Sequence, residues 1–206
     1  MKEKGNKSFW DRWAGFYDRF MHSNERLYDE IAGKMKGSLD RKMYVLELAC
    51  GTGLISRRIV GSVKSLEATD FSPKMIAEAK KNTYSARLHF SVQDATALPY
   101  APESFDAVVI ANALHILPEP EKVLSEIHRV LKPNGLLFAP TFVHGEGVGS
   151  RIRTGLMKMV GFRVYHKWSA GEFAVFIAEH GFVVKEQTDL GSNIAPLCYL
   201  TAKKEK

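Results

Sequence analysis

Tyr44-Val-Leu-Glu-Leu-Ala-Cys-Gly-Thr-Gly53 is the stretch of this sequence that decides its fold. Its first five residues have the pattern of a buried strand, and a loop containing Gly51 and Gly53 follows. Two glycines one residue apart let the backbone turn sharply and approach a ligand, because neither carries a Cβ atom. The helix predicted over residues 54–60 would point its free N–H groups at that ligand. The stretch therefore predicts a strand, a ligand-binding turn and a helix.

Strands and helices alternate along most of the chain. Apolar periodicity and turn residues predict strands over residues 44–48, 63–69, 88–92, 105–111, 136–139, 182–188 and 197–202. They predict helices over residues 24–36, 54–60, 73–82, 123–131 and 170–180. This alternation is typical of an α/β protein with a mostly parallel sheet and helices on both faces. No helix separates the last two strands, so the last strand should run antiparallel, and it should begin after Pro196.

The composition indicates one globular domain of 206 residues with 45% hydrophobic and 25% charged residues. No apolar run is long enough to cross a bilayer, and no signal-peptide pattern is present, so a cytoplasmic location is expected. The two cysteines, Cys50 and Cys198, predict neither a disulfide framework nor a metal site. A formal charge of +6 permits contact with nucleic acid or an anionic membrane but requires neither.

An aromatic stripe at helical spacing precedes the alternation and includes Trp13 and Tyr17. We predict that residues 1–40 form an N-terminal helical lid, with Tyr17 as a candidate catalytic residue. Residues 41–142 would form the cofactor-binding core, 143–168 a variable substrate or lid segment, and 169–206 the final helix and strand pair. The variable segment could also touch a membrane surface, although a packed helix with a solvated basic rim fits its pattern equally well.

Two acidic residues that follow strands predict a nucleoside-containing ligand. Asp70 ends the second strand, where a carboxylate would accept hydrogen bonds from ribose hydroxyls. Asp94 follows the third strand, and with Ala95 it could read the edge of an adenine. NAD would use a similar site, but Ser56 stands where a dinucleotide motif has its third glycine. Glu47 also disfavours a pyrophosphate and favours a ligand with positive charge, such as an ammonium or a sulfonium.

These motifs together resemble the class I methyltransferases that use S-adenosylmethionine (SAM). They are Glu47-x-x-Cys-Gly-Thr-Gly53, Asp70-Phe-Ser-Pro-Lys-Met75, Gln93-Asp-Ala-x-x-Leu-Pro99, Phe105-Asp106 and Leu131-Lys-Pro-Asn-Gly135. Residues 9–202 are similar to the branch that holds the quinone-biosynthesis C-methyltransferases and the bacterial phosphatidylethanolamine N-methyltransferases. The resemblance implies a Rossmann-like, seven-stranded sheet with a reversed last strand.

The resemblance also implies a role for eight residues in binding SAM. Glu47, Gly51 and Gly53 would line its methionine end, and Asp70 would hold the ribose. Met75 would pack on the adenine, whose edge Asp94 and Ala95 would read. Asn112 would approach SAM mostly through its backbone.

The expected reaction is an in-line methyl transfer, for which the protein supplies positioning and, for a neutral acceptor, a general base. His115 and His144 are candidate bases, although His115 could instead bond only to backbone. We expect a small or lipid-like acceptor. An RNA methyltransferase and a non-catalytic SAM-binding protein remain the alternatives, but Asn112-Ala-Leu-His115 lacks the Asn-Pro-Pro-aromatic stretch of amino-directed base methyltransferases. The sequence does not determine the oligomeric state.

Overall fold

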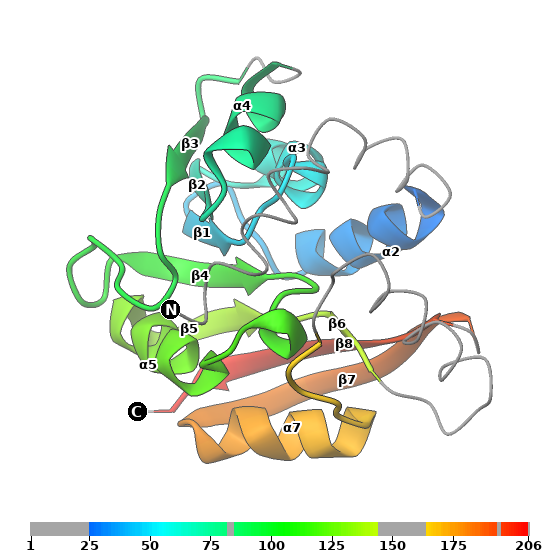
Figure 1. Ribbon diagram of the computed structural model, residues 1–206. Helices are drawn as coiled ribbons and strands as arrows, with labels where there is room; N and C mark the ends of the chain where they lie inside the picture. The colour runs from blue at the N-terminus through cyan, green and yellow to red at the C-terminus, as the bar shows by residue number, and fades with distance from the viewer. Residues whose placement is uncertain (1–24, 82–84, 144–163, 193–194, 206) are drawn as a thin grey trace.

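A computed structural model describes residues 25–81, 85–143, 164–192 and 195–205. The strands are β1 (Tyr44–Leu48), β2 (Ser65–Asp70), β3 (Leu88–Val92), β4 (Phe105–Ile110), β5 (Leu131–Phe138), β6 (Thr141–Phe142), β7 (Phe182–Ser192) and β8 (Ala195–Lys204). The helices are α2 (Glu25–Lys36), α3 (Leu54–Ile59), α4 (Pro73–Lys81), α5 (Pro120–Val130) and α7 (Ala170–Glu179), with 3₁₀ turns η2 (Val60–Ser62) and η3 (Leu114–Ile116). Figure 1 shows these elements arranged around one central sheet.

The sheet has the order β3-β2-β1-β4-β5-β8-β6, and β7 pairs with β8. The first five strands are parallel, whereas β8 is antiparallel to both β5 and β7. The predicted mostly parallel sheet with a reversed last strand is therefore confirmed. The eighth strand arises because β6 continues the line of β5 along β8 after an interruption at Pro140, whose nitrogen carries no hydrogen to donate.

Several strand boundaries differ from the prediction by a few residues, and two of these differences involve proline. β8 begins at Ala195 and includes Pro196, whose carbonyl accepts a hydrogen bond from the Val143 N–H at 3.0 Å. Proline is tolerated there because only its carbonyl is used. β5 begins at Leu131, because the ladder with β4 starts at the Phe105–Leu131 pair and shifts register across the Pro133-Asn134-Gly135 turn.

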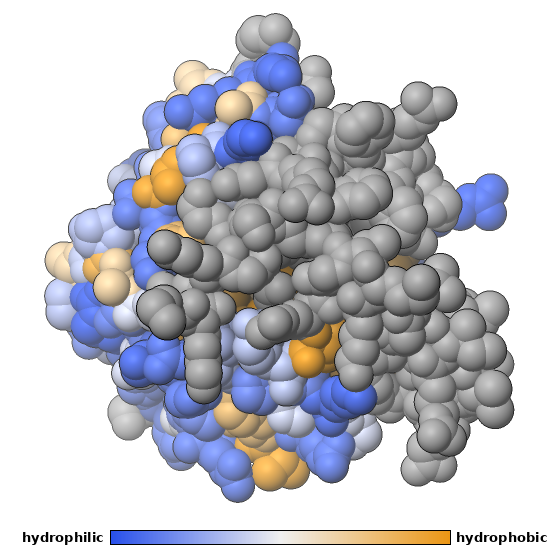
Figure 2. All heavy atoms as spheres, viewed as in Figure 1, coloured by the Kyte–Doolittle hydropathy of each residue, from blue (hydrophilic) through white to orange (hydrophobic). Residues whose placement is uncertain are grey.

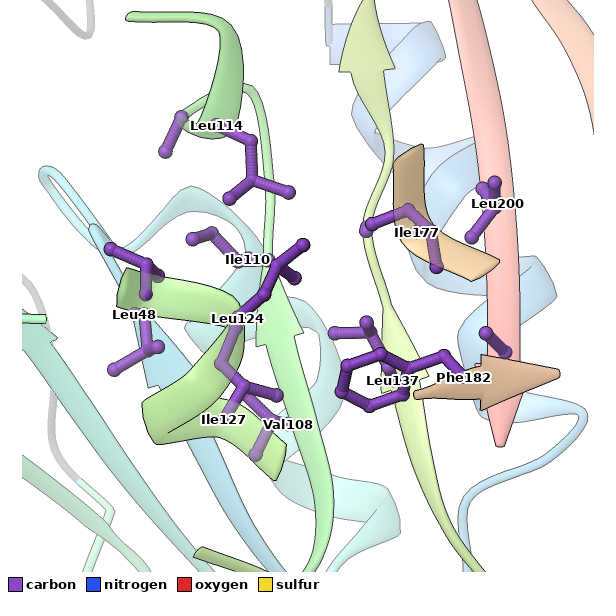
Figure 3. Packing of buried hydrophobic residues seen from close by; sticks show 14 of the residues in the cluster. Leu48, Val108, Ile110, Leu114, Leu124, Ile127, Leu137, Ile177, Phe182 and Leu200 are labelled. Atoms are coloured by element: carbon purple, nitrogen blue, oxygen red, sulfur yellow. The ribbon is translucent and has the colours of Figure 1, made fainter. Parts of the chain in front are cut away.

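The core has two halves, one on each face of the sheet, because side chains alternate along each strand. Leu46 and Leu48 of β1 point into the half covered by α5 and α7, whereas Val45 points into the half covered by α2 and α3. Figure 3 shows the first half, in which Leu124 and Ile127 of α5 and Ile177 of α7 pack over the strands. All three side chains are fully buried. These two layers hold the carboxyl ends of the parallel strands at one common edge.

Helix α2 is a core element. Ile31 and Met35 are 0% exposed. Asp29 accepts a hydrogen bond from the Arg58 side chain at 2.7 Å, and the Lys34 ammonium lies 2.7 Å from a Glu186 carboxylate oxygen on β7. The prediction of a helix over residues 24–36 is confirmed from Glu25 onward, but its side chains pack on the sheet. The rest of the predicted lid, residues 1–24, lies outside the described residues.

Hydrophilic side chains cover most of the described surface in Figure 2, with a small hydrophobic patch over α7. Val175 of this helix is 57% exposed. Within the described ranges, no helix has the length and apolar character needed to cross a membrane.

Candidate cofactor-binding site

The turn after β1 brings a strained backbone to the carboxyl edge of the sheet. Ala49, Gly51 and Gly53 have positive φ angles of 51°, 56° and 82°. The Cys50 N–H donates to the Thr69 carbonyl on β2 at 2.9 Å, and the Gly53 N–H donates to the Cys50 carbonyl at 2.9 Å. The turn is therefore held in one conformation by the neighbouring strand, and Gly53 is the N-cap of α3.

Gly53→Ala should destabilise the protein by roughly 1–2 kcal/mol from the left-handed backbone alone. A Cβ atom at this position would also lie 3.1 Å from the Phe90 ring. Gly61→Ala is the matched control, because nothing lies within 4 Å of a Cβ atom there. Urea unfolding of both variants measures the difference. Equal losses in stability would contradict this account of the turn.

Asp70 ties the turn to the next loop. One carboxylate oxygen accepts from the Gly51 N–H at 2.9 Å, and the other accepts from the Ser72 N–H at 2.8 Å. Ser72 is the N-cap of α4, because its hydroxyl accepts from the Met75 N–H at 3.1 Å. An ionised carboxylate has about four acceptor sites, which makes it a suitable partner for a ligand's hydroxyl groups.

Asp94 and Ala95 offer a paired acceptor and donor after β3. One oxygen of Asp94, Oδ1, accepts from the Thr96 N–H at 2.8 Å and from its hydroxyl at 2.7 Å. Within the part of the chain that the structure describes, neither Asp94 Oδ2 nor the Ala95 N–H has a hydrogen-bond partner. A carboxylate oxygen beside a free N–H matches the amine and ring nitrogen on an adenine edge.

One pocket joins these elements at the carboxyl edge of the sheet. Six of the eight residues predicted to bind the cofactor line it: Gly51, Asp70, Met75, Asp94, Ala95 and Asn112. Glu47 and Gly53 do not line it. Met75 is 2% exposed, so its side chain forms a buried wall of the pocket. The arrangement fits a nucleoside with ribose hydroxyls toward Asp70 and a base toward Asp94.

Glu47 lies beneath the turn and is 1% exposed. It accepts a hydrogen bond from the Ser56 hydroxyl on α3. The pKa of Glu47 is raised to about 8, mainly by burial; the Ser56 hydrogen bond and the Arg57 charge oppose this rise, and the Asp70 carboxylate adds to it. The carboxyl group is therefore mostly protonated at neutral pH in the free protein. A cation bound nearby would favour the ionised form and release a proton.

One of the three candidate catalytic residues lies within the described part of the chain. Tyr17 and His144 lie outside the described residues. His115 is 7% exposed, and its Nδ1 lies 2.8 Å from the Thr141 hydroxyl. It does not line the pocket, and its role as a base stays a prediction.

Tyr165 is a pocket residue that the sequence did not single out. The backbone N–H groups of Tyr165 and His166 both donate to the His115 carbonyl, at 3.0 and 3.1 Å. The His166 ring stacks on Trp168 at 5.0 Å between centroids, and Trp168 stacks on Phe176 of α7 at 4.7 Å. These contacts hold Tyr165 at the pocket. The segment lacks a motif, so only its aromatic content could have suggested this role.

Residues 46–139 match the family model described as a methyltransferase domain. Among curated proteins, the chain is 41% identical over 100 residues to a demethylmenaquinone methyltransferase of Renibacterium salmoninarum, covering 48% of this chain and 41% of the relative. It is 34% identical over 140 residues to the same-named enzyme of Chlamydia caviae, covering 64% and 58%. The chain thus spans roughly half the length of these relatives.

Solved structures share the fold at lower identity. A chain in the complex of the Haloferax volcanii Trm112 methyltransferase activator with a methyltransferase superposes with a TM-score of 0.77 at 21% identity, covering 96% of this chain and 98% of that one. The [4+2]-cyclase SpnF superposes at 0.72 with 24% identity, covering 88% and 80%.

The sheet order, the pocket and the match of residues 46–139 to a methyltransferase-domain model all fit the class I methyltransferases that use SAM. Part of the chain is also similar to demethylmenaquinone methyltransferases, which act in quinone biosynthesis by name. The resemblance stated from the motifs is confirmed.

Proposed function

We propose that this protein transfers a methyl group from SAM to a small, quinone-like acceptor by in-line displacement. The observation that carries the proposal is the convergence of Gly51, Asp70, Asp94 and Ala95 on one pocket. The similarity to demethylmenaquinone methyltransferases supports an aromatic, lipid-like acceptor. SAM supplies an activated methyl group, so the residues of this chain bind, orient and exclude water.

Six residues would contact SAM in this proposal, and two would support the turn beside it. Asp70 holds the ribose, Met75 packs on the adenine, and Asp94 with Ala95 binds its edge. Gly51 lies at the methionine end, which Asn112 approaches mostly through its backbone, whereas Glu47 and Gly53 support the turn from below. His115, His144 and Tyr17 stay candidates for removing a proton from the acceptor.

We further propose that the chain is a single methyltransferase domain, divided at residues 40, 142 and 168 as the sequence suggests, and that it works in the cytoplasm. The segment 150–165 would face a lipid-like acceptor and could meet a membrane surface. Nucleic acid is the less favoured acceptor. SpnF shares this fold and is a cyclase by name, so the fold by itself does not establish methyl transfer.

Incorporation of label from methyl-labelled SAM tests the proposed function. The acceptors are a reduced 1,4-naphthoquinol, a simple phenol and total transfer RNA, each with purified protein. We expect label in the naphthoquinol and none in the RNA. Label in RNA alone would make the protein an RNA methyltransferase. SAM binding by calorimetry without label in any acceptor would favour a non-catalytic SAM-binding protein.

Deletion of residues 1–24, which keeps α2, should leave SAM binding within a few-fold of the full chain. Methyl transfer should fall by roughly tenfold or more, because the predicted lid would no longer position the acceptor. Calorimetry with SAM and the labelling assay give the two readouts. A control deletion through Lys36 removes the buried Ile31 and Met35 and should not fold. Full activity of the shorter deletion would refute the lid.

A further inference from the structure

Asn112 carries a buried polar atom that the cofactor roles above leave unused. It follows β4 at the pocket, and its φ of 55° lies in the left-handed region. Its N–H donates to the Pro140 carbonyl at 2.7 Å, and this bond ties the backbone of Asn112 to the segment after β5. Its side-chain oxygen, Oδ1, is buried without a hydrogen-bond partner in the described part of the molecule.

An unsatisfied buried oxygen is costly, by about 1–3 kcal/mol, and in native proteins it requires an explanation. Four side chains in the described ranges have such an atom: Ser91, Asn112, His166 and Tyr199. Only Asn112 of these four lines the pocket. A ligand that donates a hydrogen bond to Oδ1 would satisfy it.

Tyr28 of α2 orients the Asn112 amide. The Nδ2 group donates to the Tyr28 hydroxyl at 3.4 Å, so Oδ1 is the end of the amide left for a ligand. Tyr28 is 5% exposed and lies in the core beneath α2, which holds its ring in place. Asn112 comes from the loop after β4 and Tyr28 from α2, and their side chains form a hydrogen-bonded pair.

Two of the donor groups of SAM have acceptors elsewhere in the proposed site. Asp70 takes the ribose hydroxyls and Asp94 takes the adenine amine, while the methionine end lies toward the Gly51 turn and the Asn112 backbone. We infer that the Asn112 side chain, held by Tyr28, accepts a hydrogen bond from a hydroxyl group on the aromatic methyl acceptor. Asn112 thereby selects the reduced, hydroxyl-bearing form of a quinone-like molecule. This inference rests on the proposed function.

Binding to the protein saturated with S-adenosylhomocysteine tests the inference without turnover. The probes are 1-naphthol and 1-fluoronaphthalene, which are similar in size but differ in the hydroxyl donor. The wild type should bind 1-naphthol roughly tenfold more tightly by calorimetry, as expected for one buried hydrogen bond. Asn112→Gly should lose this preference. Glycine is the correct deletion because it tolerates the positive φ without strain.

Two further variants separate the possible roles of the amide. Asn112→Asp keeps an acceptor oxygen and should keep the preference for 1-naphthol. Tyr28→Phe releases the amide and should reduce the preference by a few-fold. Each variant is first titrated with S-adenosylhomocysteine, so that the two probes are compared with the cofactor site saturated in every protein.

Several outcomes would overturn the inference: equal binding of both probes by the wild type, no binding of either, or an unchanged preference in Asn112→Gly. Loss of the preference in Asn112→Asp would show that the amide donates instead of accepting. A wild type that prefers 1-naphthol but transfers no methyl group from SAM to any phenol or quinol would refute the proposed function while leaving the hydroxyl site intact.

Discussion

Asp70→Ala is expected to weaken SAM binding at least tenfold. Hydrogen bonds to a charged acceptor contribute about 1.5–3 kcal/mol each, and two ribose hydroxyl bonds would be lost. The substitution also removes the bonds from the Gly51 and Ser72 N–H groups. The turn after β1 and the loop after β2 are then no longer linked through this carboxylate. Calorimetric titration of SAM into the folded variant measures the effect.

Asp106→Ala is the matched control for this loss. Its carboxylate also accepts from a backbone N–H, that of Tyr44 at 2.8 Å, and it pairs with Lys132 at 2.6 Å. Tyr44 begins β1, so these contacts lie at the opposite edge of the sheet from the pocket. The control should lose stability and keep its affinity for SAM. An unchanged dissociation constant in folded Asp70→Ala would remove Asp70 from the site.

Glu47→Gln is expected to abolish most of the pH dependence of stability between about pH 5 and 8. Burial raises the pKa of Glu47 from 4.5 to about 8, so between these values the folded protein holds a proton that the unfolded chain has lost. Stability of the wild type therefore falls as the pH rises through this window, by up to about 1.4 kcal/mol per pH unit. Glutamine is neutral throughout, so the variant should be more stable than the wild type at pH 8 and similar to it at pH 5.

Urea unfolding without ligand at intervals from pH 5 to 8 measures this slope for both proteins. Glu30→Gln is the control, because Glu30 is exposed on α2 and its replacement should leave the wild-type slope. Parallel slopes for the wild type and Glu47→Gln would show that Glu47 is ionised in the folded protein at neutral pH.

The sequence by itself determined the order of strands and helices and six of the residues that line the pocket. Gly51, Asp70 and Asp94 each lie at or shortly after the end of a strand, and the carboxyl ends of parallel strands meet at one edge. Local pattern and topology are therefore enough to bring these residues together. The capping box of α7, which Ser169 and Glu172 form, likewise depends on only four consecutive residues.

Only the tertiary structure decided which residues from distant segments meet the pocket and in what chemical state. Tyr28 accepts a hydrogen bond from Asn112, which is 84 positions away in the chain. Tyr165 is held at the pocket because its N–H donates to the His115 carbonyl. No local pattern encodes such contacts, because they depend on how α2 and the segment before α7 pack. The same holds for Glu47, whose carboxyl group is protonated because folding buries it under α3, away from water.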